Sequence, residues 1–267
     1  MTFPAPAALR LRRLPGRVLP RGGLDAVRQI ALCLVAYYGY SLVRGAVWNQ
    51  DISAFSNANH VIGLERGLHT FFEPAIQRWS TSQHWLITIA DWAYLNSQFT
   101  IALALLVFIY LRHNRSFYFV RNMFMVAMAM ALVLYVVFPT APPRLVPEWG
   151  FTDTVAQLTG VPAENATVNA IFNPYAAIPS MHVAFSLMLG LTLARLVGPR
   201  ALRALFWAYP AFIIWVVIAT GNHFWFDVVC GAAVAGSAAW SARRIGQLRP
   251  HAWAFAPGGR SAAEAPA

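Results

Sequence analysis

Residues 119–138 read FVRNMFMVAMAMALVLYVVF, a run of 20 residues in which Arg121 is the one charged side chain. A helix needs about 20 predominantly apolar residues to cross the hydrocarbon core of a bilayer. This run therefore predicts a transmembrane helix. Five further runs have the same character and predict about six spans in total. They cover residues 27–47, 85–111, 182–196, 202–220 and 224–242.

The composition supports an all-α polytopic membrane protein. Hydrophobic residues make up 58% of the chain and charged residues 11%, whereas about a quarter of a soluble domain is charged. The net charge of +10 would suit a nucleic-acid-binding protein, but the basic residues, all of them arginine, lie in short clusters between apolar runs. This distribution is typical of membrane topology, and we expect no nucleic-acid partner.

The arginines also predict the orientation, because cytoplasmic loops carry the excess of positive residues. With the N-terminus in the cytoplasm, sixteen of the 20 arginines fall on inner segments. The outer segments keep Arg44, Arg66, Arg78 and Arg144. The sequence thus predicts a multi-pass protein of the cell membrane with both termini in the cytoplasm.

Three regions follow from this layout: a disordered basic cytoplasmic tail at 1–26, a membrane domain at 27–244, and a disordered cytoplasmic tail at 245–267. Between the first two spans, apolar residues recur at helical spacing. They predict one amphipathic helix lying in the outer membrane interface. Its apolar residues are Ile62, Leu64, Leu68, Phe71, Phe72, Ile76 and Trp79.

Three polar clusters are predicted to meet on the outer face: PTAPPR at 139–144, PSMH at 179–182 and GNHFWFD at 221–227. Ionisable groups at the edge of the hydrocarbon are costly and are by default candidates for function. His223 and Asp227 are four residues apart at a predicted helix start, which places them on one face. The carboxylate can accept a hydrogen bond from one ring nitrogen and leave the other as a nucleophile.

Each of these residues also has a structural interpretation. His223 and Asp227 could cap a helix, a lone interfacial His182 is usually structural, and Arg144 could anchor a lipid headgroup. Their convergence on one predicted face favours a shared site.

The motifs resemble those of the type 2 phosphatidic acid phosphatase superfamily, in the branch that contains inositol phosphorylceramide synthases and sphingomyelin synthases. Within that branch the chain is similar to actinobacterial members over about residues 28–243. The resemblance is carried by PTAPPRL at 139–145, GFTDT at 150–154, NPYAAIPSMH at 173–182 and TGNH at 220–223.

The resemblance implies a role for each candidate. His223 matches the nucleophile that forms a phosphohistidine, Asp227 the aspartate that orients it, and His182 the general acid. Arg144 and Ser180 match phosphate-binding residues, and we add Asn222 to this substrate-binding group. Arg144, Ser180 and backbone donors at helix ends are expected to stabilise the phosphate charge without a metal or other cofactor.

Two departures from the phosphatase pattern favour a particular substrate. Val137 stands where the phosphatases have a lysine, and Val216 and Val217 stand where they have a serine–arginine pair. The remaining cations neutralise a dianionic phosphomonoester less well than a monoanionic phosphodiester. We therefore expect a lipid phosphotransferase that moves a phosphoryl headgroup, such as inositol phosphate, at the outer face.

Two alternatives stay open. The first is a phosphatase acting on phosphatidate or polyprenyl phosphates, in which water attacks the phosphohistidine. The second is a non-catalytic membrane transporter, in which polar residues of segment 91–98 line a pathway. The sequence does not fix the acceptor or the oligomeric state.

Overall fold

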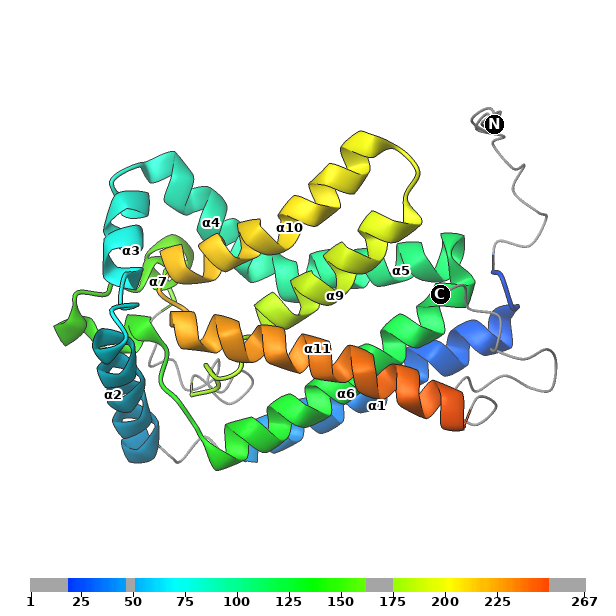
Figure 1. Cartoon of the computed structure of the whole chain (residues 1–267), viewed down its shortest axis with the longest axis horizontal. Helices are drawn as coiled ribbons and strands as arrows, with labels where there is room; N and C mark the ends of the chain where they lie inside the picture. Colours follow the sequence, from blue (N-terminus) through cyan, green and yellow to red (C-terminus); the bar gives the residue numbers. More distant parts are fainter. Residues whose placement is uncertain (1–18, 47–50, 162–174, 250–267) are drawn as a thin grey trace, which may run out of the picture.

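The computed structural model describes residues 19–46, 51–161 and 175–249, and this part of the chain is helical with no strands. The longer helices form a bundle (Figure 1). They are α1 (Gly23–Ala46), α4 (His84–Asn96), α5 (Ala102–Arg112), α6 (Asn114–Val137), α9 (Met181–Leu196), α10 (Arg200–Ala219) and α11 (Trp225–Leu248). Shorter elements are α2 (Asp51–Gly67), α3 (Glu73–Thr81), α7 (Thr154–Thr159) and two 3₁₀ turns, Pro143–Leu145 and Pro147–Trp149.

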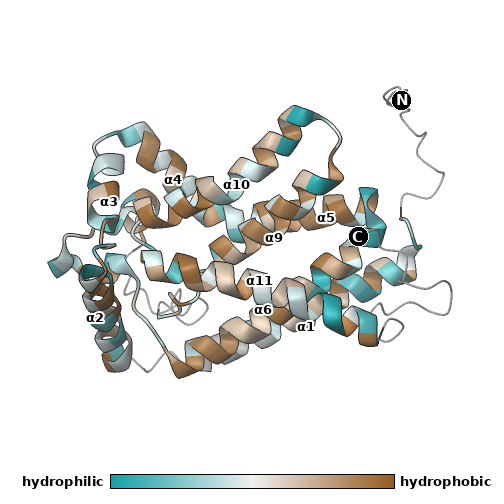
Figure 2. Ribbon diagram, viewed as in Figure 1, coloured by the Kyte–Doolittle hydropathy of each residue, from teal (hydrophilic) through white to brown (hydrophobic). Residues whose placement is uncertain are grey.

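Three helical segments are long and apolar enough to cross a membrane. They are His84–Arg112 with 29 residues, Asn114–Val137 with 24 and Arg200–Ala219 with 20. The first is continuous because a π-helical turn, Ser97–Ile101, joins α4 to α5. Figure 2 shows hydrophobic residues along these helices and hydrophilic residues where α5 meets α6 and where α10 begins. These helices have the length and composition of transmembrane spans.

The predicted count of about six spans is not confirmed, although each of the six predicted runs lies on a helix. Met181–Leu196 is apolar but has only 16 residues, which at 1.5 Å per residue is shorter than the roughly 30 Å hydrocarbon core. α11 has 24 residues but is rich in alanine, glycine and serine, which contribute little hydropathy.

Small residues let the helices of the bundle approach closely. α9 packs against α6, α10 and α11. A Cβ at Gly190 of α9 would lie only 2.7 Å from the carbonyl oxygen of Phe206 in α10, so this crossing requires glycine. Close helix approach through small residues is common in membrane bundles. The buried core between α6, α9 and α11 includes Ala127, Leu189, Leu193 and Ala238.

The outer segment forms two helices instead of the single amphipathic helix predicted. α2 ends at Gly67, the backbone turns at His69 with φ of 57°, and α3 begins at Glu73 with Pro74 in its first turn. Proline favours a helix start, and a positive φ ends the preceding helix. α2 lies across the end of the bundle beside the start of α11 (Figure 1).

The boundaries of the predicted tails differ from the helix ends. α1 begins at Gly23, inside the predicted tail 1–26, and α11 continues to Leu248, past the predicted domain end at 244. The rest of both tails, at 1–18 and 250–267, lies outside the described residues, as do residues 173–174 of the NPYAAIPSMH motif.

Candidate active site

The loop between α10 and α11 carries the candidate nucleophile. α10 ends at Ala219, and α11 begins at Trp225. Gly221 turns the chain with φ of 66°, and a Cβ there would lie 2.6 Å from Nε2 of Gln77. Both features require glycine. The turn leaves His223 almost fully buried, directly before the first residues of α11.

Asp227 and His223 form a buried pair. Oδ2 of Asp227 lies 3.2 Å from Nδ1 of His223 and accepts the backbone N–H of Phe224 at 2.9 Å. An ionised carboxylate can only accept, so Nδ1 carries the proton in this pair. The lone pair of the neutral imidazole then lies on Nε2. The arrangement is suited to nucleophilic attack by Nε2, with Asp227 stabilising the positive charge that develops on the ring.

His182 lies at the start of α9, on the other side of the candidate site. Its ring centroid is 5.8 Å from that of His223. Nε2 of His182 lies 3.2 Å from the backbone carbonyl oxygen of Tyr94, and the two rings stack with centroids 4.3 Å apart. A carbonyl oxygen only accepts, so Nε2 holds a proton. Nδ1 is therefore the nitrogen of His182 that can exchange a proton with a substrate.

Tyr94 was not among the residues expected from the sequence to contribute to the site. It lies in α4, three residues before the π-helical turn Ser97–Ile101. Such turns are rare in proteins overall, and those that occur often lie at functional sites. The polar residues of segment 91–98 were the available signal, but neither a ring stacking partner nor a carbonyl acceptor can be recognised from residue type.

The starts of α9 and α11 are joined directly. The backbone N–H of Ser180 donates to the carbonyl oxygen of Asp227 at 3.1 Å. A Cβ at Gly231 would lie 2.4 Å from the carbonyl oxygen of Ser180, so the absence of a side chain permits this approach. Ser180 is fully buried, and its Oγ accepts the N–H of Val183 at 3.5 Å as the N-cap of α9. Its hydroxyl therefore already has a structural role.

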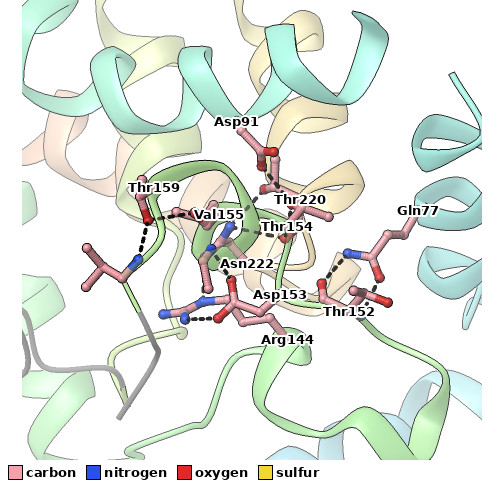
Figure 3. A network of polar contacts seen from close by, with 12 residues as sticks. Gln77, Asp91, Arg144, Thr152, Asp153, Thr154, Val155, Thr159, Thr220 and Asn222 are labelled. Atoms are coloured by element: carbon pink, nitrogen blue, oxygen red, sulfur yellow. Dashed lines mark hydrogen bonds and ion pairs between the residues drawn. The ribbon is translucent and has the colours of Figure 1, made fainter. Parts of the chain in front are cut away.

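Arg144 contacts Asn222, which lies in the loop between α10 and α11 directly before His223 (Figure 3). The backbone N–H of Arg144 donates to the carbonyl oxygen of Gly221 at 2.7 Å, and its Nε donates to Oδ1 of Asn222 at 2.8 Å. Its Nη1 forms an ion pair with Asp153 at 2.9 Å. The arginine predicted to bind phosphate is thus already oriented by an amide and a carboxylate. Asp153 belongs to the GFTDT motif, but the sequence did not indicate this pairing.

The residues on both sides of Asp153 are attached to α3 and α4. Gln77 exchanges two hydrogen bonds with the backbone of Thr152, at 2.9 and 3.0 Å (Figure 3). Oγ1 of Thr154 donates to Oδ1 of Asp91 at 2.7 Å. Asp91, which the transporter interpretation places along a pathway, is buried and hydrogen-bonded to this loop.

Backbone donors at helix ends were expected to stabilise the phosphate charge, but at the start of α11 carboxylates already occupy these donors. The N–H groups of Phe224, Trp225 and Phe226 donate to Asp227, Glu73 and Glu65 in turn. The start of α11 therefore differs from an open anion site of the usual helix-terminal kind. The expectation of helix-end donors does not hold for these three amides.

The three valines that stand in place of the phosphatase residues lie in different surroundings. Val216 and Val217 are fully buried among apolar side chains at the end of α10, and Val137 is exposed at the end of α6.

Among the residues that the structure describes, no group of three histidine, cysteine or acidic side chains could hold a metal ion.

Comparison with known proteins identifies one family. A family model described as the PAP2 superfamily matches residues 59–241, which contain all six predicted site residues. No curated protein and no solved structure gave a match. Together with the apolar helices, the family match indicates a membrane protein, and it confirms the superfamily resemblance but not the actinobacterial synthase-like branch.

Proposed function

The chain belongs to the PAP2 superfamily, whose members are phosphatases or phosphotransferases acting on lipid phosphates, and we propose that it is a membrane lipid phosphotransferase. The proposed reaction moves a phosphoryl-containing headgroup between lipids through a phosphohistidine. The observation that carries this proposal is the buried His223–Asp227 pair facing His182, with ring centroids 5.8 Å apart.

The first half-reaction uses both histidines. Nε2 of His223 attacks the phosphorus of the donor, a nitrogen–phosphorus bond forms, and the bond from phosphorus to the leaving oxygen breaks. His182, doubly protonated at this stage, donates its Nδ1 proton to that oxygen. Asp227 stabilises the positive ring of His223 through the Nδ1 hydrogen bond. The first product leaves as a neutral alcohol such as diacylglycerol.

The second half-reaction reverses the proton transfer. Nδ1 of His182, now unprotonated, takes the proton of an incoming hydroxyl group as its oxygen attacks the phosphohistidine. The nitrogen–phosphorus bond breaks, and His223 returns to its starting form. Water in place of the alcohol would give a phosphatase by the same steps. The choice between the two activities therefore depends on which hydroxyl group reaches His223.

Phosphate binding is assigned to Arg144, Asn222 and Ser180. The guanidinium of Arg144 uses Nε and Nη1 for Asn222 and Asp153, which leaves Nη2 to face a phosphate oxygen in a fixed orientation. Positioning and charge are the main requirements of phosphoryl transfer. Ser180 would contribute its hydroxyl hydrogen while its oxygen remains the N-cap of α9.

The scarcity of cations supports a phosphodiester donor, as in the inositol phosphorylceramide synthase-like branch. A phosphomonoester carries up to two negative charges and a phosphodiester only one. Val216 and Val217 are enclosed by apolar side chains, so the end of α10 supplies no charge. A phospholipid with an inositol phosphate headgroup fits this charge requirement.

A donor and acceptor panel tests the proposal. Purified protein would receive phosphatidylinositol or phosphatidate, each labelled in the diacylglycerol part, with or without inositol, other soluble alcohols and lipid alcohols. We expect labelled diacylglycerol from phosphatidylinositol together with a new phosphodiester on an added alcohol, and neither product from His223→Ala. Release from phosphatidate with water alone would make the protein a lipid phosphatase. Equal product from wild type and His223→Ala would refute the histidine mechanism.

We also propose that the site faces the extracytoplasmic side, because the arginine distribution puts the three motifs on outer segments. The test uses a variant without Cys33 and Cys230, carrying either Arg115→Cys or Gln157→Cys at exposed positions. A membrane-impermeant thiol reagent applied to intact cells should label position 157 only. Labelling of position 115 only would reverse the orientation.

A further inference from the structure

Two glutamates from α2 and α3 hold the first turn of α11. Oε1 of Glu73 accepts the backbone N–H of Trp225 at 2.7 Å, and Oε1 of Glu65 accepts that of Phe226 at 2.7 Å. Both side chains are almost completely buried. Charge-assisted hydrogen bonds of this length are among the stronger ones in proteins. The outer helices therefore attach directly to the turn that carries His223 and Asp227.

The second carboxyl oxygens of the two glutamates, both Oε2, indicate that the pair holds a proton. Oε2 of Glu65 and Oε2 of Glu73 are both buried without a donor, and the Oε1 atoms of the two side chains accept consecutive backbone N–H groups of α11, which brings the two carboxyl groups together. Two buried carboxylates this close repel each other unless one of them is protonated. Burial, Glu73 and Asp227 raise the pKa of Glu65 to about 9. One proton shared by two adjacent buried carboxyls is a known arrangement.

We propose that Glu65 and Glu73 share one proton and act as a positioning pair, which fixes the start of α11 and thereby the direction in which His223 faces His182. This inference rests on the proposed function, in which His223 is the nucleophile. Neither glutamate touches the reacting atoms in the proposed steps. The pair acts through the backbone N–H groups of Trp225 and Phe226, which are the first two residues of α11.

The charge of the pair fits its location. With one shared proton the pair carries a single negative charge, which the positive end of the α11 dipole favours. The titratable groups that act on Glu65 are Glu73 from α3 and Asp227 from α11. Loss of the shared proton would place three carboxylates around one helix end. Repulsion among them would displace the first turn of α11, and a misplacement of about 1 Å can cost a factor of 100 in rate.

The direction of the pH dependence follows from the raised pKa. The folded protein holds the proton more tightly than the unfolded chain, in which a glutamate titrates near 4.3. The stability contributed by the protonated pair is therefore complete below about pH 4 and is lost as pH rises through about 9. We expect kcat to fall over the same alkaline range, with KM changing less, because the nucleophile is misdirected while Arg144 remains in place.

Glu65→Gln removes the titrating carboxyl group of Glu65 but keeps an acceptor for the N–H of Phe226. The amide oxygen can still accept the N–H of Phe226, and the amide nitrogen can donate to Glu73 at every pH. We expect near wild-type kcat at neutral pH and no alkaline fall attributable to the pair. Glu65→Ala, which removes the acceptor, should lower kcat about 100-fold while the variant still inserts. Glu148→Gln, at an exposed carboxylate of the outer loops, is the matched control and should change neither property.

An infrared difference spectrum tests the proton without using the reaction. The carbonyl band of a protonated carboxyl should be present in wild type at pH 7, disappear as pH rises through about 9, and be missing from Glu65→Gln but not from Glu148→Gln. An identical band in wild type and Glu65→Gln, or wild-type kcat in Glu65→Ala, would overturn the inference. Trapped phosphate on His223 is measured separately, so failure of the glutamate pair is distinguishable from failure of the proposed function.

Discussion

α1 begins at one end of the bundle and α11 begins at the other (Figure 1). Each of these ends contains a buried polar cluster, and the clusters differ in how completely their hydrogen bonds are satisfied. At the end where α1 begins, the carboxyl group of Asp25 accepts from Tyr110, Tyr118 and Gln29. At the other end, Glu65, Glu73 and Asp227 each have one buried oxygen without a fixed donor. No atom of the first cluster belongs to this group within the described ranges.

This difference separates a structural cluster from a functional one. A buried polar atom without a partner costs about 1–3 kcal/mol, and native proteins tolerate few of them. Three such oxygens around the start of α11 therefore require an explanation, which the histidine site and the shared proton supply. The Asp25 cluster needs none, because its hydrogen bonds account for its burial. We expect mutations at the end where α11 begins to impair catalysis and mutations at the end where α1 begins to impair stability.

The largest effect is expected from His223→Ala, which removes the nucleophile. Turnover should be abolished, and no acid-labile phosphoenzyme should form with labelled donor. The variant should still insert and fold, because Oδ2 of Asp227 keeps its hydrogen bond from the backbone N–H of Phe224. Retention of phosphoenzyme in this variant, or labelled phosphate recovered on His182, would mean that the two histidines are assigned wrongly.

Asp227→Asn is expected to lower kcat by roughly a thousandfold or more, by analogy with the loss of the orienting aspartate in other histidine-dependent sites. Oδ2 of Asp227 accepts both the N–H of Phe224 and the Nδ1–H of His223, so an amide oxygen in its place can keep both hydrogen bonds and the fold. The neutral amide lacks the negative charge that stabilises the positive ring of His223 as Nε2 attacks. Single-turnover kinetics should show slow phosphoenzyme formation in a folded protein. Normal rates would separate Asp227 from the chemistry.

His182→Ala is expected to lower kcat by about 100- to 10,000-fold with an ordinary lipid donor, the usual range for a general acid. A donor whose leaving group has a low pKa needs little protonation and should partly restore the first half-reaction. The same donor should not restore His223→Ala. Identical responses of the two variants would contradict the division of roles between the histidines.

Arg144→Lys is expected to have a smaller effect, on the order of tenfold in kcat/KM. The guanidinium reaches Asn222, Asp153 and a phosphate at once, whereas an ammonium acts as a point charge on a flexible chain. Asp153→Asn should weaken the orientation of Arg144 but keep its charge, and it serves as the comparison. Wild-type kinetics in Arg144→Lys would favour a lipid-headgroup anchor over a phosphate-binding role.

The sequence predicted the helices better than the contacts between them. Apolar runs of about 20 residues indicate helices because length and hydropathy are local properties, and α6 and α10 begin and end close to the predicted runs. The single helix predicted between the first two spans was wrong because the chain turns at His69 and starts a new helix at Glu73, and the apolar residues of the two helices lie in different surroundings. Ile62 is buried against the loops, whereas Leu68 and Trp79 are exposed.

The supporting residues of the candidate site could not be predicted from the sequence. The spacing of His223 and Asp227 is local, and their hydrogen bond was anticipated from it. Glu65, however, reaches Phe226 across 161 positions of the chain, and Tyr94 reaches His182 across 88. Such pairings depend on how helices pack. A glutamate in an outer segment has the same appearance in sequence whether it faces water or holds a helix end.

The smallest effect on activity is expected from Tyr118→Phe in the Asp25 cluster. The change removes the 2.8 Å hydrogen bond to Oδ2 of Asp25, which keeps its 2.9 Å hydrogen bond from Tyr110. The cost should be about 1–3 kcal/mol, the range for a hydrogen bond to a charged or buried acceptor. The ring of Tyr118 lies under the guanidinium of Arg21 at 4.2 Å, and phenylalanine preserves that contact. The apparent melting temperature in detergent should therefore fall by a few degrees, while kcat and KM of the folded protein stay unchanged. Tyr38→Phe, at an exposed ring of α1, is the control for loss of a hydroxyl group alone and should change neither. A loss of kcat in Tyr118→Phe at unchanged folded fraction would show that the Asp25 cluster takes part in function, and the contrast between the two ends would no longer hold.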